Sequence, residues 1–155
     1  MSDWLKIILT AAATLIGGMI LFVFAEFARA LVLTPLYKYR EQVQLVLDRL
    51  DYYSNRLTNF FPDEPSEQER QLIKQIESDL RSAATQLKSK YMSITWRKSL
   101  ILIRIIPSQD KVNEAYQSLI YLHNSILYKG QVDEHNNAKT NNEKIELVKN
   151  ALLMN

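Results

Sequence analysis

The feature that most constrains the fold of this chain is an apolar run close to its N-terminus. No charged side chain occurs in the 19 residues of Ile7–Ala25. As an α-helix the run would be about 28 Å long, at ~1.5 Å per residue, which matches a bilayer hydrocarbon core of about 30 Å. Trp4 and Lys6 precede the run, and Glu26 and Arg29 follow it, as is typical of membrane boundaries. We therefore predict one transmembrane helix.

A cleaved signal peptide is the alternative interpretation of the run, because residues 28–30 read Ala-Arg-Ala and resemble a cleavage site. The long apolar stretch and the single lysine before it favour a permanent anchor. Lys6 alone precedes the run, whereas Arg29, Lys38 and Arg40 follow it. The positive-inside rule then predicts that the C-terminal domain is cytoplasmic. We expect a single-pass protein of the bacterial inner membrane.

Small residues form a line along the predicted membrane helix, with Thr10, Thr14 and Gly18 at i+4 spacing. Such a line lets two membrane helices approach closely. Small residues are also common in membrane helices in general, so the spacing leaves self-association open.

The remainder of the chain is expected to be helical, which makes the fold class all-α. The 155 residues include only 3 glycines and 4 prolines, too few turn-forming residues for many short strands. We expect two parts: residues 1–33, the N-terminal transmembrane helix and its exit from the membrane, and residues 34–155, a cytoplasmic helical ligand-binding domain. Thr34-Pro35 should break or kink the helix between them, because proline lacks the amide N–H and clashes with the preceding turn.

A heptad repeat begins directly after this proline and predicts a helix from about residue 36 to residue 60. Its two apolar positions are Leu36, Val43, Leu50 and Leu57, and three residues later Tyr39, Val46, Tyr53 and Phe60. Such a face either packs into the core of its own domain or joins neighbouring copies in a helical bundle. The repeat alone leaves both alternatives open.

Further helices are indicated by their capping residues and apolar spacing. Ser66 and Glu69 form a capping box, which predicts a helix running to about Tyr91. The apolar stretch 94–106 suits a buried helix or a strand, and we favour a short helix. The remaining expected elements are a helix from its N-cap Ser108 to about Gly130, a polar loop from Gln131 to Asn142, and a final helix with Ile145, Val148 and Leu152 on one face.

Residues able to carry out catalysis or bind a metal are scarce. The chain has no cysteine and two histidines, His123 and His135, neither of which stands in a metal-ligand spacing. We expect His123 at the edge of the core. The three glycines form no phosphate-binding loop. We therefore expect no enzymatic activity, no metal and no cofactor.

A basic segment stands out between Asp79 and Asp110. No acidic residue occurs between these two, while six lysines and arginines do, in a chain of net charge +2. Cations can hold phosphate groups, and an aromatic ring can stack on a base for about 1 to 3 kcal/mol. The candidate ligand-binding residues are Arg97, Lys98, Arg104, Trp96, Lys90 and Tyr91. The alternatives are a solvated basic face and attraction to anionic lipid headgroups.

In its order of elements and its size, the whole chain resembles the small membrane-anchored effectors of type III CRISPR systems that sense cyclic tetra-adenylate. The segment Ile106-Pro107-Ser108 and the later Leu122-His123-Asn124-Ser125 are also similar to a stretch of bacterial membrane-anchored proteins. The resemblance implies a homotetramer whose cytoplasmic domains bind one cyclic oligonucleotide. It carries over no individual binding residue.

We therefore expect a membrane effector of antiviral defence. In this interpretation a cyclic oligoadenylate second messenger rearranges the transmembrane helices and disrupts the membrane or opens a pore. The heptad helix would couple the two parts. The alternative function is a membrane-tethered protein-interaction module or scaffold without a nucleotide ligand. The expected partners are the messenger, the lipid bilayer and further copies of the chain, and the small net charge of +2 gives no indication of DNA binding.

Overall fold

The computed structural model describes residues 3–59, 64–127 and 134–153, and every regular element in these ranges is a helix. This confirms the all-α prediction. The elements are α1 (Asp3–Ala28), the π-helical turn η1 (Arg29–Leu33), α2 (Thr34–Thr58), α3 (Glu67–Met92), α4 (Arg97–Leu102), α5 (Gln109–Leu127) and α6 (Glu134–Leu152).

The first three elements form one unbroken helix from Asp3 to Thr58. The expected break at Pro35 is therefore wrong. Proline cannot donate to the carbonyl one turn earlier and its ring crowds that carbonyl. The wider π-helical turn just before it resolves the conflict, since the Thr34 amide donates to the carbonyl of Arg29, five residues back.

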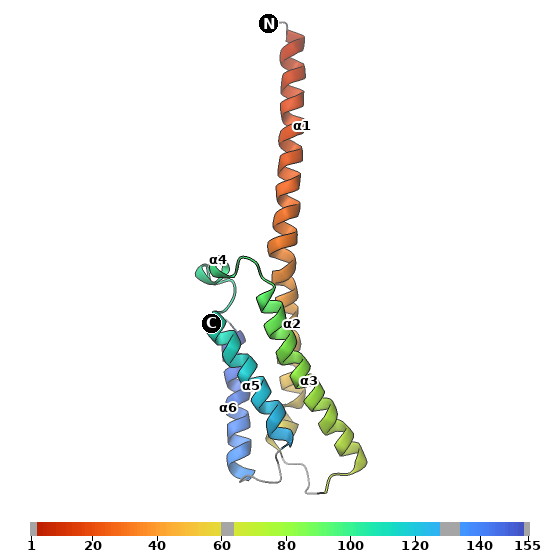
Figure 1. Ribbon diagram of the computed structural model, residues 1–155, viewed down its shortest axis with the longest axis vertical. Coiled ribbons are helices and arrows are strands. Elements are labelled where there is room, and N and C mark those ends of the chain that lie inside the picture. Colours follow the sequence, from red (N-terminus) through yellow and green to blue (C-terminus); the bar gives the residue numbers. More distant parts are fainter. Residues whose placement is uncertain (1–2, 60–63, 128–133, 154–155) are drawn as a thin grey trace.

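Helix α1 is long and apolar enough to span a membrane, and none of its residues is buried against the rest of the protein. Figure 1 shows it projecting far beyond the other helices. The Thr14 hydroxyl donates to the carbonyl of Thr10 at 2.8 Å, which satisfies this polar group within the helix. Glu26 and Arg29 pair at 3.7 Å just after the apolar run.

Helices α2, α3, α5 and α6 form a four-helix bundle. Each packs against the next, and α6 closes the ring against α2. Their directions alternate (Figure 1), so this is an up-down-up-down arrangement with α4 as the connection between α3 and α5. Helix α3 begins with the predicted capping box, in which Ser66 and Glu69 exchange hydrogen bonds.

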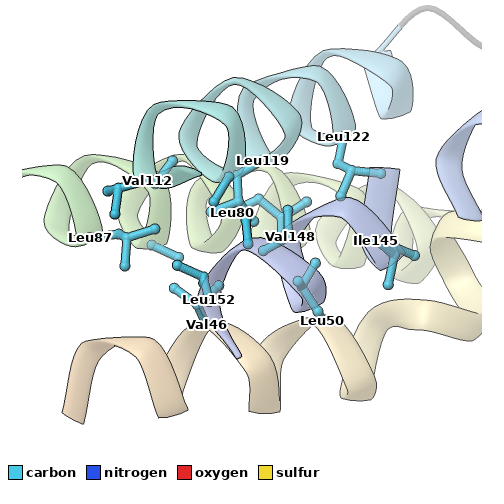
Figure 2. Packing of buried hydrophobic residues seen from close by; sticks show 14 of the residues in the cluster. Val46, Leu50, Leu80, Leu87, Val112, Leu119, Leu122, Ile145, Val148 and Leu152 are labelled. Carbon is cyan, nitrogen blue, oxygen red and sulfur yellow. The ribbon is translucent and has the colours of Figure 1, made fainter. Parts of the chain in front are cut away.

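The heptad face of α2 lies in the core of this bundle. Val46 and Leu50 are fully buried, and Figure 2 shows them beneath Leu80 of α3 and Val148 of α6. The interpretation in which the heptad packs within its own domain is therefore correct for the described residues. Its last position, Phe60, lies outside them. Leu36 and Val43, at the α1 end of the same face, are half-buried.

Helix α6 begins earlier than expected, because residues 134–142 are helical rather than part of a polar loop. Asn141, in this part of the helix, is buried. Its side-chain amide donates to the carbonyl of Leu57 at 2.7 Å, at the C-terminal end of α2. The expected helix end at Gly130 and the start of the expected loop lie outside the described residues.

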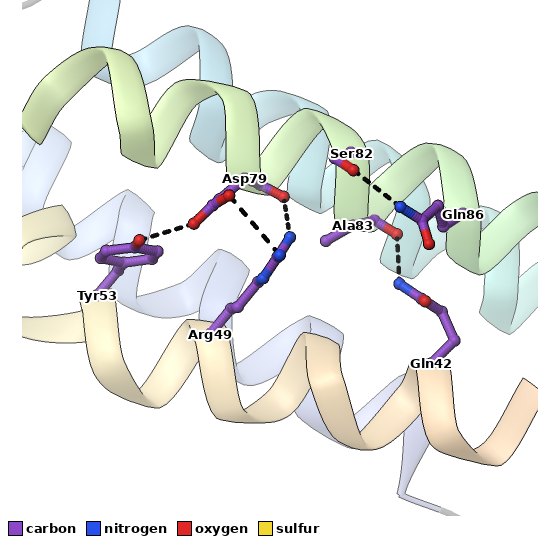
Figure 3. A network of polar contacts seen from close by, with 7 residues as sticks. All are labelled: Gln42, Arg49, Tyr53, Asp79, Ser82, Ala83 and Gln86. Atoms are coloured by element: carbon purple, nitrogen blue, oxygen red, sulfur yellow. Dashed lines mark hydrogen bonds and ion pairs between the residues drawn. The ribbon is translucent and has the colours of Figure 1, made fainter. Parts of the chain in front are cut away.

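A polar network joins α2 to α3 beside the core (Figure 3). Tyr53 donates from its hydroxyl to Asp79 Oδ2 at 2.8 Å, and Arg49 donates to the Asp79 carbonyl at 2.9 Å. Arg49 also lies 3.7 Å from the Asp79 carboxylate. Farther along the same seam, Gln42 donates to the carbonyl of Ala83 at 3.4 Å. These contacts hold the long helix in a defined register against α3.

Candidate functional site

The six candidate residues of the predicted basic segment lie between Lys90 and Arg104, at the end of the bundle where α2 begins and α3 ends. We call this the α1-proximal end. Tyr39 of α2 and Tyr91 of α3 mark this end, with ring centroids 5.5 Å apart. Figure 1 shows α4 level with the junction of α1 and α2. The cations of α4 are thus placed beside the base of the candidate membrane span.

Tyr91 is fully buried, which corrects its predicted role as a stacking surface for a ligand. Its hydroxyl donates to the Pro107 carbonyl at 3.1 Å, so the ring connects the end of α3 to the start of α5. Burial raises the pKa of this phenol above its usual value. The sequence showed an aromatic residue among cations, but whether the ring faces solvent depended on packing.

Arg97 is half-buried and contacts other residues of its own chain. Its guanidinium lies 5.8 Å from the centre of the Tyr91 ring and donates to the carbonyl of Met92. These contacts hold the first turn of α4 onto the end of α3. Lys90 lies half-buried in the last turn of α3, where a cation interacts favourably with the helix dipole.

Three of the six predicted residues remain exposed, namely Trp96, Lys98 and Arg104. The indole of Trp96 is 58% exposed. Trp96 and Lys98 line an open hollow of about 340 Å³ that is formed by residues 95–99. The structure thus divides the predicted set into an inward-facing part, which supports the fold, and an outward-facing part, which is free to bind.

Arg104 ends α4 in a backbone conformation that normally calls for glycine. Its φ is 57°, the only positive φ of a non-glycine residue in the described part of the chain. The Arg104 amide donates to the Ile101 carbonyl, and the Ile105 amide donates to the Leu100 carbonyl. This pair of bonds is a Schellman motif. A side chain at its left-handed position costs about 1 kcal/mol relative to glycine.

Sequence reasoning missed the exposure of two large apolar side chains beside these cations. Leu102 is 83% exposed and Ile103 is 61% exposed, whereas Leu100 is buried. The apolar stretch 94–106 had indicated a buried element as a whole. The shortness of the apolar stretch is the signal that could have distinguished Leu100 from Leu102 and Ile103. A helix of so few residues cannot bury all of its side chains against the bundle.

Four hollows on the described surface are open, and each of these is lined by a single segment. The hollow beside Trp96 is one of them, and another, of about 610 Å³, follows one side of α2 past Tyr37, Leu45 and Tyr52. A third, on α3, contains Arg81. A ligand of oligonucleotide size would therefore be held against an open surface, or between copies of the chain.

The histidines and acidic residues give no sign of a metal site within the described residues. His123 is buried, and its Nδ1 lies 3.2 Å from the carbonyl of Glu77, at the edge of the core as expected. The side chain of His135 lies outside the described residues.

Neither the family models nor the curated proteins nor the solved structures compared with the chain give a match.

Proposed function

We propose that the chain is a non-enzymatic effector of the bacterial inner membrane, with α1 as its single span and the bundle in the cytoplasm. The observation that carries this proposal is the unbroken helix Asp3–Thr58, which joins the candidate span to the bundle. A change in the position of α2 would reach the membrane directly, because no flexible linker separates α2 from α1.

The proposed orientation depends on the cations that flank the span. Lys38 and Arg40, on the first turns of α2, are exposed and lie on the bundle side of the span, together with Arg29. On the other side, Lys6 pairs with Asp3 at 3.5 Å. This asymmetry supports a cytoplasmic bundle by the positive-inside rule.

The proposed ligand is an anion with several phosphates, of which cyclic tetra-adenylate is the specific candidate. Lys98 and Arg104 are exposed and would meet phosphate groups, while the exposed face of Trp96 would stack on a base. The hollow lined by Trp96 and Lys98 is open, so one copy would not enclose such a ligand. A symmetric oligomer, with a tetramer matching a fourfold ligand, would supply the missing contacts.

Ligand binding would act by shifting an equilibrium between two arrangements of the long helices. It can do so only to the extent that the ligand prefers one arrangement over the other. The heptad face stays within the bundle, so we place the change in the packing of α1 and in the exposed side of α2.

The test is calorimetric binding of cyclic tetra-adenylate to the full chain in a zwitterionic nanodisc. We expect micromolar or tighter binding, at least about tenfold weaker for Lys98→Glu, since charge-assisted bonds to phosphate contribute more than 1.4 kcal/mol. Lys74→Glu is the matched control, because Lys74 is an exposed cation of α3 outside the α4 region. No binding by the wild-type chain would refute the nucleotide ligand, and equal loss in both variants would refute the site.

A membrane-tethered interaction module is the second candidate function. It is favoured by the exposed aromatic side of α2, where Tyr37 is 71% exposed and Tyr52 is 78% exposed. Exposed aromatic rings are common anchors of protein interfaces. Purification of a stoichiometric protein partner that is lost in Tyr52→Ala, from a chain that is otherwise monomeric, would establish this function instead.

A further inference from the structure

We propose that residues 96–104, which we call the α4 segment, form a peripheral docking element that lies on the anionic phospholipid headgroups of the bilayer that α1 spans. This goes beyond the proposed ligand-binding function, because it assigns a second ligand, lipid, to the exposed side chains of α4. Trp96, Lys98 and Arg104 serve both roles, so the nucleotide and the anionic headgroups would compete for them. It depends on α1 being a membrane span and on no property of a nucleotide.

The first observation is the apolar character of the outer surface of α4. Trp96, Leu102 and Ile103 are all more than half exposed, at 58%, 83% and 61%. Leu100 is buried, so α4 is fixed to the protein through this residue while the three large side chains around it are left uncovered. Tryptophan and large aliphatic side chains in this arrangement are typical of elements that enter the interfacial layer of a bilayer.

The second observation is the charge around these apolar side chains. Lys98 and Arg104 are exposed beside them, and the chain has no acidic residue between Asp79 and Asp110. Acidic lipid headgroups attract such a cluster without repulsion from a neighbouring carboxylate. A protein partner would need a matching acidic and apolar surface, whereas an anionic bilayer presents both features over its whole area.

The third observation is the position of α4 relative to the span. Figure 1 shows α4 level with the junction of α1 and α2, that is, near Arg29–Leu33. At ~1.5 Å per residue, these residues lie about 6 to 12 Å beyond Ala25, where the apolar run ends. The headgroup layer on each side of a bilayer is about 5 to 8 Å thick. The outer side chains of α4 can therefore reach the headgroups while α1 spans the hydrocarbon.

The fourth observation is the residue that closes α4. A glycine would fit the left-handed position better than Arg104, whose φ is 57°. Local structure thus gives no reason for an arginine here. Contact with an anionic surface gives one, because the left-handed turn holds this exposed cation next to Ile103 at the tip of the segment.

The test uses the fluorescence of Trp96 in the full chain. The protein has two tryptophans, so Trp4→Phe leaves Trp96 as the only reporter. This variant is reconstituted in vesicles of phosphatidylcholine, with or without phosphatidylglycerol and with brominated acyl chains as quenchers. We expect blue-shifted and quenched emission in the phosphatidylglycerol vesicles and weaker effects in phosphatidylcholine alone.

Charge variants identify the residues that carry the docking. Lys98→Glu should lower the ratio of protein with Trp96 docked on lipid to protein with Trp96 in water by at least about fivefold. This is the effect of removing one cation, worth about 1 kcal/mol at an anionic surface. Arg104→Gly should lower the ratio while leaving the thermal unfolding midpoint unchanged or raised, and Arg104→Lys should restore docking. Lys74→Glu, an exposed cation of α3 outside the segment, should leave docking unchanged.

Trp96 emission typical of an indole in water, unquenched in both kinds of vesicle, would overturn the proposal. Protection of Trp96 from a water-soluble quencher without quenching by brominated lipid would also overturn it, because another protein surface would then cover the segment. No nucleotide is present in this assay, and nucleotide binding is measured without anionic lipid. Failure of one proposal is therefore distinguishable from failure of the other.

Discussion

Replacing Tyr53 by phenylalanine tests how firmly the long helix is held to α3. Tyr53 is 4% exposed, and its hydroxyl donates to Asp79 Oδ2 at 2.8 Å. The substitution removes this one bond between α2 and α3 and leaves the ring packing unchanged. Asp79 keeps its contact with Arg49 at 3.7 Å and stays partly hydrated, so its carboxylate is not left isolated.

The expected cost follows from these contacts. A hydrogen bond to a charged group contributes about 1.5 to 3 kcal/mol, and the partial hydration of Asp79 places this one at the lower end, about 1.5 kcal/mol. For a helical domain of roughly 100 residues this lowers the unfolding midpoint by about 6 °C. The measurement is thermal unfolding of the full chain in detergent micelles, followed by circular dichroism at the helical minimum.

The same substitution should change how stability depends on pH. Burial, followed by the hydrogen bond to Asp79, raises the pKa of Tyr53 to about 12 from a usual value of 10.0. The folded protein therefore holds this proton more tightly than the unfolded chain. The resulting stability is complete below pH 10 and is lost as the pH rises toward 12. The difference between wild type and Tyr53→Phe should thus shrink over this range.

Tyr52→Phe is the matched control, because Tyr52 adjoins Tyr53 in the sequence and is 78% exposed. We expect its unfolding midpoint to equal that of the wild type. Equal midpoints for Tyr53→Phe and the wild type, or a difference that persists unchanged above pH 12, would refute the assignment of this bond to Tyr53 and Asp79.

Two further substitutions test the packing of the bundle. Leu80→Ala removes a fully buried side chain of α3 and should cost about 3 kcal/mol in the free energy of unfolding, whereas Leu45→Ala, on the exposed side of α2, should cost less than about 1 kcal/mol. Denaturant titration of both variants checks this. Asn141→Ala removes the donor to Leu57 and should cost about 1 to 3 kcal/mol, with faster amide hydrogen exchange at the start of α6 than in the wild type.

Local patterns in the sequence predicted most of the helices. The Ser66 and Glu69 capping box acts within one helical turn, so the start of α3 could be deduced from neighbouring residues alone. The heptad of α2 predicted its buried face, because helical spacing places those side chains on one side. The length of the apolar run Ile7–Ala25 likewise predicted a helix able to span a membrane.

The candidate site was predicted less completely, because the sequence records which side chains are present but not where they face. Tyr91 and Trp96 are both aromatic residues among cations, yet one is fully buried against Tyr39 and the other is 58% exposed. Whether each ring faces the core or the solvent depends on the path of the chain between the end of α3 and α4. Contacts between segments distant in sequence, such as the hydrogen bond from Tyr91 to the Pro107 carbonyl, hold this path.

Interactions within a few residues of one helix account for the helical class, the apolar helix, the capped start of α3 and the faces that enter the core. The π-helical turn before Pro35 is also local, since its hydrogen bond joins Thr34 to Arg29, but no apolar or capping pattern predicts it. The burial of Asn141 against Leu57 and the exposure of Leu102 and Ile103 depend instead on how separate elements pack. Short-range sequence patterns do not record such packing.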